Sequence, residues 1–346
     1  MEAEFLNLNT NRLNMKFILG ENYQNYIPYF PKVKRVIWLV RHGERLDNDK
    51  EVKEMAKIDG YINDENSGRK FSLDNSPLNQ RGLERAAALN NVFNNIDIQH
   101  LFASPYERAI QTAVKLLGDS HKNYSESRIL TSQLKIKVEP GFIETMSCVD
   151  EHIGYEKIKE LRKHHPRLDV TYTPIFNKKL LAKNYKVEEG GNSDMGCCRR
   201  IKDALNGLIE NLENGTLKYR KFFNSSLLSQ INEGTYKNQW IQPGEETADQ
   251  IVIVSHALPI CAVHNIAAGM YTYAPQTSIT KIVELDLSKI VESGTPWYGS
   301  IQLVEAHRTI PGRTGFDNSE RSYSSAVSWA RGKLACVMYV TCMSTY

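Results

Sequence analysis

Short apolar runs alternate with amphipathic stretches along much of this chain. Four short runs predict strands of a buried sheet: 34–40, 99–103, 136–138 and 251–254. Alternating apolar and polar positions predict two further strands, 280–286 and 300–305. Apolar residues at helical spacing predict helices at 77–94, 104–117, 154–164, 194–212 and 259–268. This order predicts a single α/β domain, with a central, mostly parallel mixed sheet and helices on both faces.

Four polar segments flank or interrupt the pattern. We expect residues 1–31 to form a poorly structured leader, 214–249 an insertion, and 311–346 a C-terminal tail. The domain then occupies residues 32–310. The stretch 46–76 shows no clear periodicity, and loops of that length inside a compact domain are usually functional, so we expect a long excursion over a strand end.

Composition excludes several classes of function. The chain has 346 residues and a formal net charge of only +3, so nothing global predicts binding to nucleic acid or to an anionic membrane. The start lacks the features of a secretory signal, and no apolar run approaches the length of a membrane span. The six cysteines show neither zinc spacing nor a disulfide framework. We therefore expect a cytoplasmic protein with no metal site.

Two strand ends carry the residues that point to chemistry. Arg41, His42 and Arg45 follow the buried run 34–40, at the end of the strand where open α/β sheets bind ligands. Gly43 allows a sharp backbone turn there. His256 follows the run 251–254 in the same way. Histidines and arginines at adjacent strand ends predict a pocket for a phosphate, with a nucleophile inside it.

Two further residues complete the predicted pocket. Arg108 lies in the first turn of a helix just past the strand 99–103, where backbone N–H groups and a guanidinium can bind phosphate oxygens together. A neutral imidazole can attack phosphorus, but the leaving oxygen then needs a proton from a carboxylic acid. Glu144, a few residues past the strand 136–138, is the candidate acid, and Glu139 is the alternative.

Several of these segments resemble one known family. Five blocks occur in the order found in the histidine phosphatase superfamily, which has the phosphoglycerate mutase-like fold: LVRHGER, PLNQRGLERA, FASPYERAIQTA, KVEPGFIE and VIVSHALPI. The resemblance covers roughly residues 33–310. Within the family, the Glu-Arg after His-Gly and the runs VEPGFIE and DVTYTPIF are most similar to one branch. That branch contains the STS (ubiquitin-associated and SH3 domain-containing) phosphatases and the ecdysteroid-phosphate phosphatases.

The resemblance implies a role for each candidate residue. It implies transient phosphorylation of His42 and an acid/base role for Glu144. The remaining residues would hold the phosphoryl group: Arg41, Arg45, Arg108 and His256. The implied activity is a metal-independent phosphomonoesterase without a cofactor, acting on phosphotyrosine protein or on a small phosphate ester such as a steroid phosphate.

The chain departs from that branch in places. Thr145 and Met146 follow the candidate acid where the branch carries an aromatic residue, so the substrate wall is expected to differ. The ubiquitin-associated and SH3 modules are absent from the sequence, so no partner that binds through them is implied.

Two other functions stay open at this point. One is phosphoryl transfer of the phosphoglycerate mutase type, and the other is a non-catalytic scaffold of the same fold. The complete set of candidate residues favours catalysis over a scaffold. The expected partner is a phosphorylated substrate, with no nucleic acid and no membrane, and the oligomeric state stays open, a homodimer included.

Overall fold

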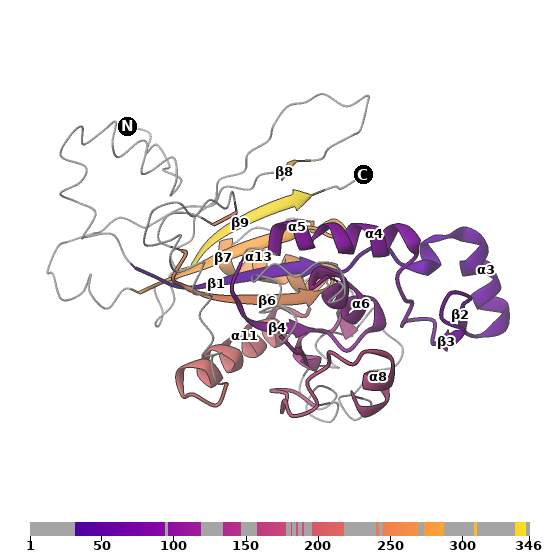
Figure 1. Cartoon of the computed structure of the whole chain (residues 1–346), viewed down its shortest axis with the longest axis horizontal. Coiled ribbons are helices and arrows are strands. Elements are labelled where there is room, and N and C mark those ends of the chain that lie inside the picture. Colours follow the sequence, from indigo (N-terminus) through magenta and orange to yellow (C-terminus); the bar gives the residue numbers. More distant parts are fainter. Residues whose placement is uncertain are drawn as a thin grey trace, which may run out of the picture.

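The computed structural model describes residues 32–93, 96–118, 134–146, 158–177, 181, 185, 189, 196–217, 240–241, 245–268, 273–286, 308–309 and 336–343. Its centre is a seven-stranded sheet with the order β5-β4-β6-β1-β7-β9-β8 (Figure 1). The strands are β1 (Lys32–Arg41), β4 (Ile98–Ala103), β5 (Ile136–Val138), β6 (Asp249–Ser255), β7 (Ile279–Asp286), β8 (Arg308–Thr309) and β9 (Cys336–Met343). Four of the six pairings are parallel, and β1–β7 and β7–β9 are antiparallel. The predicted mixed, mostly parallel sheet is confirmed.

The register of the parallel strands brings their carboxyl ends to one edge of the sheet. Arg41 at the end of β1 pairs with Ser255 at the end of β6. Ala103 at the end of β4 pairs with Val254 of β6 and with Val138 of β5. Each residue that follows these strands therefore lies at the same edge, where ligands bind in open α/β sheets.

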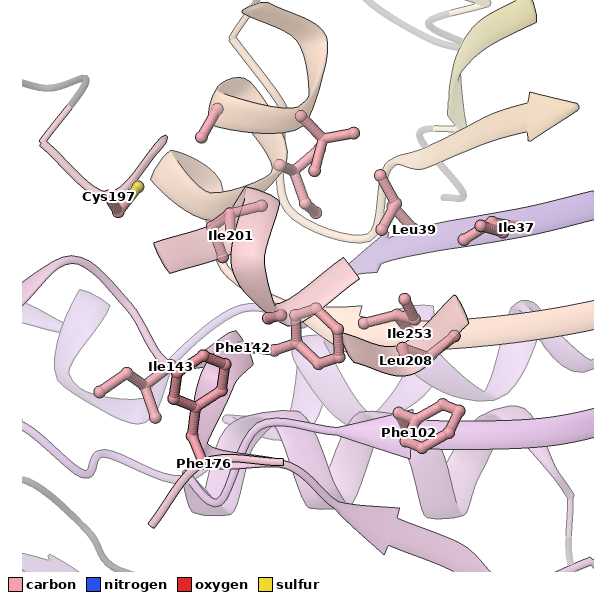
Figure 2. Close-up of a cluster of buried hydrophobic side chains, with 14 of the residues drawn as sticks. Ile37, Leu39, Phe102, Phe142, Ile143, Phe176, Cys197, Ile201, Leu208 and Ile253 are labelled. Carbon is pink, nitrogen blue, oxygen red and sulfur yellow. The ribbon is translucent and has the colours of Figure 1, made fainter. Parts of the chain in front are cut away.

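Helices cover both faces of the sheet because the side chains of the buried strands alternate. Val36, Trp38 and Val40 share one apolar cluster with α5 (Asn90–Phe93) and α6 (Glu107–Leu116). Ile37 and Leu39 lie in another cluster, which includes α11 (Cys198–Glu213) and α13 (Ala257–Ala268). Figure 2 shows part of this second cluster, with Ile201 and Leu208 of α11 over the sheet. The two clusters confirm the helices predicted on both faces.

The stretch 46–76 is more regular than the sequence suggests. It contains η3 (Leu46–Asn48), α3 (Lys50–Asp59), and a hairpin of β2 (Ile62–Asp64) and β3 (Arg69–Phe71), at one end of the molecule (Figure 1). Asp49 caps α3 by accepting N–H bonds from its first turn, and Gly60 ends the helix at a φ of 77°. The helix buries only Ala56 fully, so its apolar periodicity is too weak to be seen in the sequence.

Other element boundaries also differ from the sequence prediction. The predicted helix 77–94 is two helices, α4 (Gln80–Ala88) and α5. The predicted helix 154–164 is described only as α8 (Ile158–His164). Part of the predicted tail, β9, pairs with β7 in the central sheet. The predicted leader, the strand 300–305 and most of the insertion lie outside the described residues. Among the helices that are described, none combines the length and the apolar character needed to cross a membrane.

Candidate active site

The two histidines meet at the carboxyl edge of the sheet. His42 follows β1 and His256 follows β6, and the backbone N–H of His42 donates to the carbonyl of Ser255 at 3.0 Å. Both imidazoles are buried, and their ring centroids are 5.1 Å apart. The pairing of two adjacent parallel strands thus joins residues that are more than 200 positions apart in the sequence.

The His42 ring is held in one tautomer. Its Nδ1 lies 2.7 Å from the carbonyl oxygen of Gly43. Because a carbonyl oxygen can only accept, Nδ1 carries the proton and Nε2 presents a lone pair. Burial, followed by the charges of Arg108 and Arg41, lowers the pKa of His42 well below its usual value of 6.5. The imidazole is therefore neutral near neutral pH, which is the form that can act as a nucleophile.

The side chain of His256 is buried as completely as that of His42. Its Nε2 is 2.7 Å from the hydroxyl oxygen of Ser104, and its ring packs edge-on against Tyr106 with centroids 5.2 Å apart. Burial, followed by the charge of Arg108, lowers the pKa of His256 well below 6.5. Its Nδ1 has no hydrogen-bond partner among the described residues. A buried ring nitrogen of this kind is a candidate for contact with a ligand.

Arg41 and Arg108 place two guanidinium groups beside the histidines. Arg41 Nη1 donates to the hydroxyl of Tyr273 at 2.8 Å and to the carbonyl of Ala274 at 2.6 Å. Arg108 Nη1 donates to the carbonyl of Asp74 at 2.8 Å. In both arginines Nε is buried and has no partner in the described part of the chain. Two buried donors without acceptors, next to neutral imidazoles, favour the binding of an anion.

Arg45 is placed differently from the other two arginines. Its Nε donates to Asp47 Oδ1 at 2.7 Å, and its Nη2 forms a second bond to the same carboxylate. Burial opposes the charged form of Arg45, but the bonds to Asp47 outweigh burial and raise its pKa. The side chain lies within electrostatic range of Glu144 and Arg108, at the partly exposed rim of the site. Its charge is shared with Asp47, a partner that no pattern in the sequence indicates.

The structure separates the two candidate acids. Glu139 is fully buried, and its carboxylate accepts four bonds, from the N–H groups of Gly141, Ile175 and Phe176 and from the hydroxyl of Tyr172. These bonds use the acceptor capacity of Glu139 to fold the loop.

Glu144 has a different environment. Burial raises the pKa of Glu144 above its usual value, and the Thr145 N–H and the charges of Arg108 and Arg41 only partly oppose this. Glu144 therefore lies among the arginines of the site, in an environment that favours the protonated carboxyl.

Gly43 has a different role from the one expected. Its φ is not in the left-handed region, so it is not required for a sharp turn. Instead, an added Cβ at Gly43 would lie 2.7 Å from the carbonyl oxygen of Gly82 in α4. The two glycines allow the backbone after β1 to approach α4 closely, and Thr112 of α6 accepts the N–H of Gly43 at 3.0 Å.

The six predicted residues lie close enough to interact electrostatically, and three further residues that the sequence analysis did not name support them. Ser104 contacts His256, Tyr273 contacts Arg41, and Arg200 holds the loop of Glu144. Ser104 has a usable signal in the sequence, because it directly follows β4 at the same sheet edge. Arg200 has no such signal, because the sequence does not distinguish it from its neighbour Arg199, which is exposed on the same helix.

The described residues also bear on metals and thiols. No group of three or more His, Cys, Asp or Glu side chains within the described ranges could hold a metal ion. Cys197, Cys198 and Cys261 are free thiols. Cys197 is fully buried where α11 begins, and burial raises its pKa, which disfavours the reactive thiolate.

One protein-family model matches a large part of this chain. Residues 37–217 match the model of the histidine phosphatase superfamily (branch 1). The chain belongs to this superfamily. The matched residues include five of the six candidate site residues, and His256 lies beyond them, directly after β6. The resemblance inferred from the sequence blocks is confirmed.

Individual relatives are more distant. The chain is 28% identical over 161 residues to the mouse ubiquitin-associated and SH3 domain-containing protein A, and the match covers 41% of this chain and 24% of that protein. The chain thus spans about a quarter of the length of that relative.

Solved structures are also similar to this chain. One is the ecdysone phosphate phosphatase from Bombix mori in complex with tungstate (16% identity, TM-score 0.41, 72% of this chain and 89% of that one). Another is the phosphoglycerate mutase from Bacillus anthracis (15% identity, TM-score 0.33, 73% and 89%).

Proposed function

We propose that this chain hydrolyses phosphate monoesters through a phosphohistidine at Nε2 of His42. The observation that carries the proposal is the state of the His42 ring. Its proton is fixed on Nδ1 by the Gly43 carbonyl, and burial with two nearby guanidinium charges keeps the ring neutral. Nε2 is then a ready nucleophile at the edge of the sheet where substrates enter.

The cationic groups around His42 suit the charge of a phosphoryl group. Arg41 and Arg108 each hold a buried Nε without a partner in the described chain, and His256 holds a third such nitrogen. In the transition state of phosphoryl transfer, negative charge is spread over the equatorial oxygens, and donors fixed in advance stabilise it. Such groups supply the positive charge within the protein itself, so the proposed route needs no metal.

Glu144 completes the two steps. In the first step, Nε2 of His42 forms a bond to phosphorus while the bond from phosphorus to the ester oxygen breaks, and Glu144 gives its proton to that oxygen. In the second step, Glu144 takes a proton from water, whose oxygen bonds to phosphorus, and the bond from phosphorus to nitrogen breaks. The raised pKa of Glu144 suits the first role near neutral pH.

Membership of the family and one exposed aromatic residue support a proposal for the substrate class. We propose a phosphotyrosine protein or a small phosphate ester such as a steroid phosphate as substrate. The exposed ring of Tyr273, which contacts Arg41 through its hydroxyl, offers an aromatic wall beside the phosphate site. Inorganic phosphate and an alcohol or phenol are the expected products.

Rapid-quench trapping tests the mechanism. With a ³²P-labelled aryl phosphate, wild type should carry acid-labile, alkali-stable label and release one phosphate for each ester cleaved. His42→Ala should lose both label and turnover. Glu144→Gln should still become labelled by esters with good leaving groups but should turn over alkyl phosphates poorly.

Three results would contradict the proposal. Unchanged turnover in His42→Ala would exclude the phosphohistidine route. Efficient isomerisation of 3-phosphoglycerate in the presence of a bisphosphate primer, with negligible phosphate release, would assign the chain to the mutases instead. Absence of any turnover or label in wild type across aryl, alkyl and steroid phosphates would favour a binding role.

A further inference from the structure

The loop that carries Glu144 is bound by a buried ion pair, Arg200 with Glu189, which takes no part in the two proposed chemical steps. We propose that Arg200 and Glu189 are positioning residues, which fix the Glu144 carboxyl in place for proton transfer to the leaving group. The inference rests on the proposed function and extends it. Neither residue belongs to a motif that the sequence reveals.

All five N–H groups of Arg200 donate to Glu189 or to the loop of Glu144. The side chain is fully buried on α11. Nε and Nη2 donate to the two oxygens of Glu189 at 2.6 and 2.9 Å. Nη1 donates to the carbonyls of Gly141 and Ile143 at 2.6 and 3.1 Å, and Nη2 also donates to the carbonyl of Glu144 at 3.3 Å. The five donors of a guanidinium are therefore divided between one carboxylate and three carbonyls of a single loop.

Glu189 holds the same loop on the other side of the acid. Its Oε2 accepts the backbone N–H of Met146 at 3.0 Å, in addition to the bond from Arg200. The ion pair thus contacts backbone groups at 141, 143, 144 and 146. The side chain of Glu144 projects from the middle of a segment whose two flanks are fixed.

The loop is also fixed to the sheet and to the core. Ser255 at the end of β6 donates its hydroxyl to the Phe142 carbonyl at 2.8 Å. Phe142 and Ile201, the residue after Arg200, belong to the same apolar cluster over the sheet (Figure 2). The loop therefore connects directly to the strand end that carries His256. Small displacements of α11 would move the acid relative to the two histidines.

The chemistry of the pair suits positioning better than stability. Two buried charges lose their hydration, and replacement of such pairs by apolar residues is often neutral or stabilising. A guanidinium that binds three carbonyls fixes the direction of a loop in a way that apolar packing does not. General acid catalysis depends on the placement of the proton donor within a fraction of an ångström of its working position.

The chain itself offers a matched control. Arg35 of β1 and Glu284 of β7 form a second buried Arg–Glu pair, with Nη1 donating to the two carboxylate oxygens at 2.9 and 2.7 Å. Arg35 lies near the start of β1, at the opposite end of the strand from His42. Replacement of this pair removes the same charges from the core without a contact to the Glu144 loop, although Arg35 also lies 3.6 Å from Glu213, at the end of α11 that is far from Arg200.

The experiment compares two esters that differ in their need for an acid. The leaving group of 2,4-dinitrophenyl phosphate departs without a proton, and that of phenyl phosphate needs one.

The test uses three variants. In the first, called the clamp variant, Arg200→Met is combined with Glu189→Met, so that no unpaired charge is left in the core. Arg200→Lys is a milder second variant. The control is Arg35→Met with Glu284→Met. Circular dichroism and thermal unfolding identify the folded variants, and kcat/KM is measured for both esters because it reports only the first step.

We expect a loss that depends on the leaving group. The clamp variant should lower kcat/KM about 30- to 100-fold for phenyl phosphate and less than about threefold for 2,4-dinitrophenyl phosphate. Arg200→Lys should lie between wild type and the clamp variant. In a Glu144→Gln background, the clamp substitutions should add less than about threefold for either ester. The control should keep the ratio of the two esters at its wild-type value.

Three outcomes would overturn the inference. Equal losses for the two esters in the clamp variant and in Arg200→Lys would show a purely structural role. A full further loss in the Glu144→Gln background would show that the pair acts through another group. Failure of the proposed function would give another result: wild type would cleave neither ester and would carry no label. That result would overturn the inference as well.

Discussion

Replacement of Arg108 by alanine is expected to separate the activity of this chain from its stability. Arg108 is only 2% exposed, and the centre of its guanidinium lies 4.5 Å from the centroid of the Tyr106 ring. Among the described residues, no carboxylate is within ion-pair distance of it. It donates to the Asp74 carbonyl, and the charges of Glu144 and Asp47 offset the effect of its burial only in part.

The cost of this charge to stability can be worked out. Burial is the main cause that lowers the pKa of Arg108 from its usual value to about 10. At about 1.36 kcal/mol for each pKa unit, the charged form is roughly 3 kcal/mol less favourable in the folded state than in the unfolded state. Near neutral pH Arg108 is charged in both the folded and the unfolded state, so its burial lowers the free energy of unfolding by this full amount. Alanine removes the buried charge, which stabilises the fold, but it also leaves a cavity beside Tyr106, which destabilises the fold by a similar amount. The free energy of unfolding should therefore change by less than about 2 kcal/mol.

Activity should change far more. If the contacts of Arg108 with the phosphoryl group contribute about 3–5 kcal/mol in the transition state, Arg108→Ala should lower kcat/KM by about two to four orders of magnitude. The assay is steady-state hydrolysis of p-nitrophenyl phosphate, with thermal unfolding measured on the same samples. Inorganic phosphate or vanadate should raise the Tm of wild type and should raise that of the variant much less.

The same substitution should also move the pH profile. After burial, the charge of Arg108 is the largest cause that lowers the pKa of His42. Removal of the charge lets the pKa of His42 rise toward its usual value. Because only the neutral imidazole is a nucleophile, the acid limb of kcat/KM should shift to higher pH. The shift is measured against wild type with one substrate, so that ionisation of the substrate cancels.

A control and two refuting results complete this test. Arg199→Ala removes an exposed arginine of α11 and should leave kcat/KM within about threefold of wild type. Kinetics of Arg108→Ala within threefold of wild type would place Arg108 outside the site. A fall in Tm large enough to unfold the variant at the assay temperature would refute the reasoning on stability.

Two further predictions concern the backbone and metals. Gly82→Ala should destabilise the chain by about 1–3 kcal/mol because the added methyl group meets the backbone of Glu44, which cannot move aside as a side chain can. Gly207→Ala, in another helix, meets the side chain of Ile175 rather than backbone and should cost less stability than Gly82→Ala; equal Tm values for the two variants would contradict this. Excess EDTA should leave hydrolysis unchanged while vanadate inhibits it, and a loss on chelation that Mg²⁺ or Zn²⁺ restores would require a metal that the mechanism lacks.

The sequence alone predicted where the candidate site lies. The runs before His42 and His256 are apolar enough to be buried strands, and burial and strand periodicity are properties of a few adjacent residues. Strands that alternate with helices become parallel neighbours, so the residues that follow them meet at one edge. The position of Arg108 at a helix start is equally local. Local pattern is therefore enough to predict that these three residues belong to one site.

The tertiary structure decided which of these groups are in contact and which are saturated by other partners. The sequence names Glu144 as the candidate acid but leaves Glu139 as an alternative, and the four bonds that saturate Glu139 appear only in the folded chain. Arg199 and Arg200 are adjacent on one helix, and only packing buries the second beneath the Glu144 loop. Whether a polar side chain is solvated, saturated by partners or left ready for a ligand depends on atoms brought from distant parts of the chain. That information enters only when the chain is folded, because burial removes water as the alternative partner.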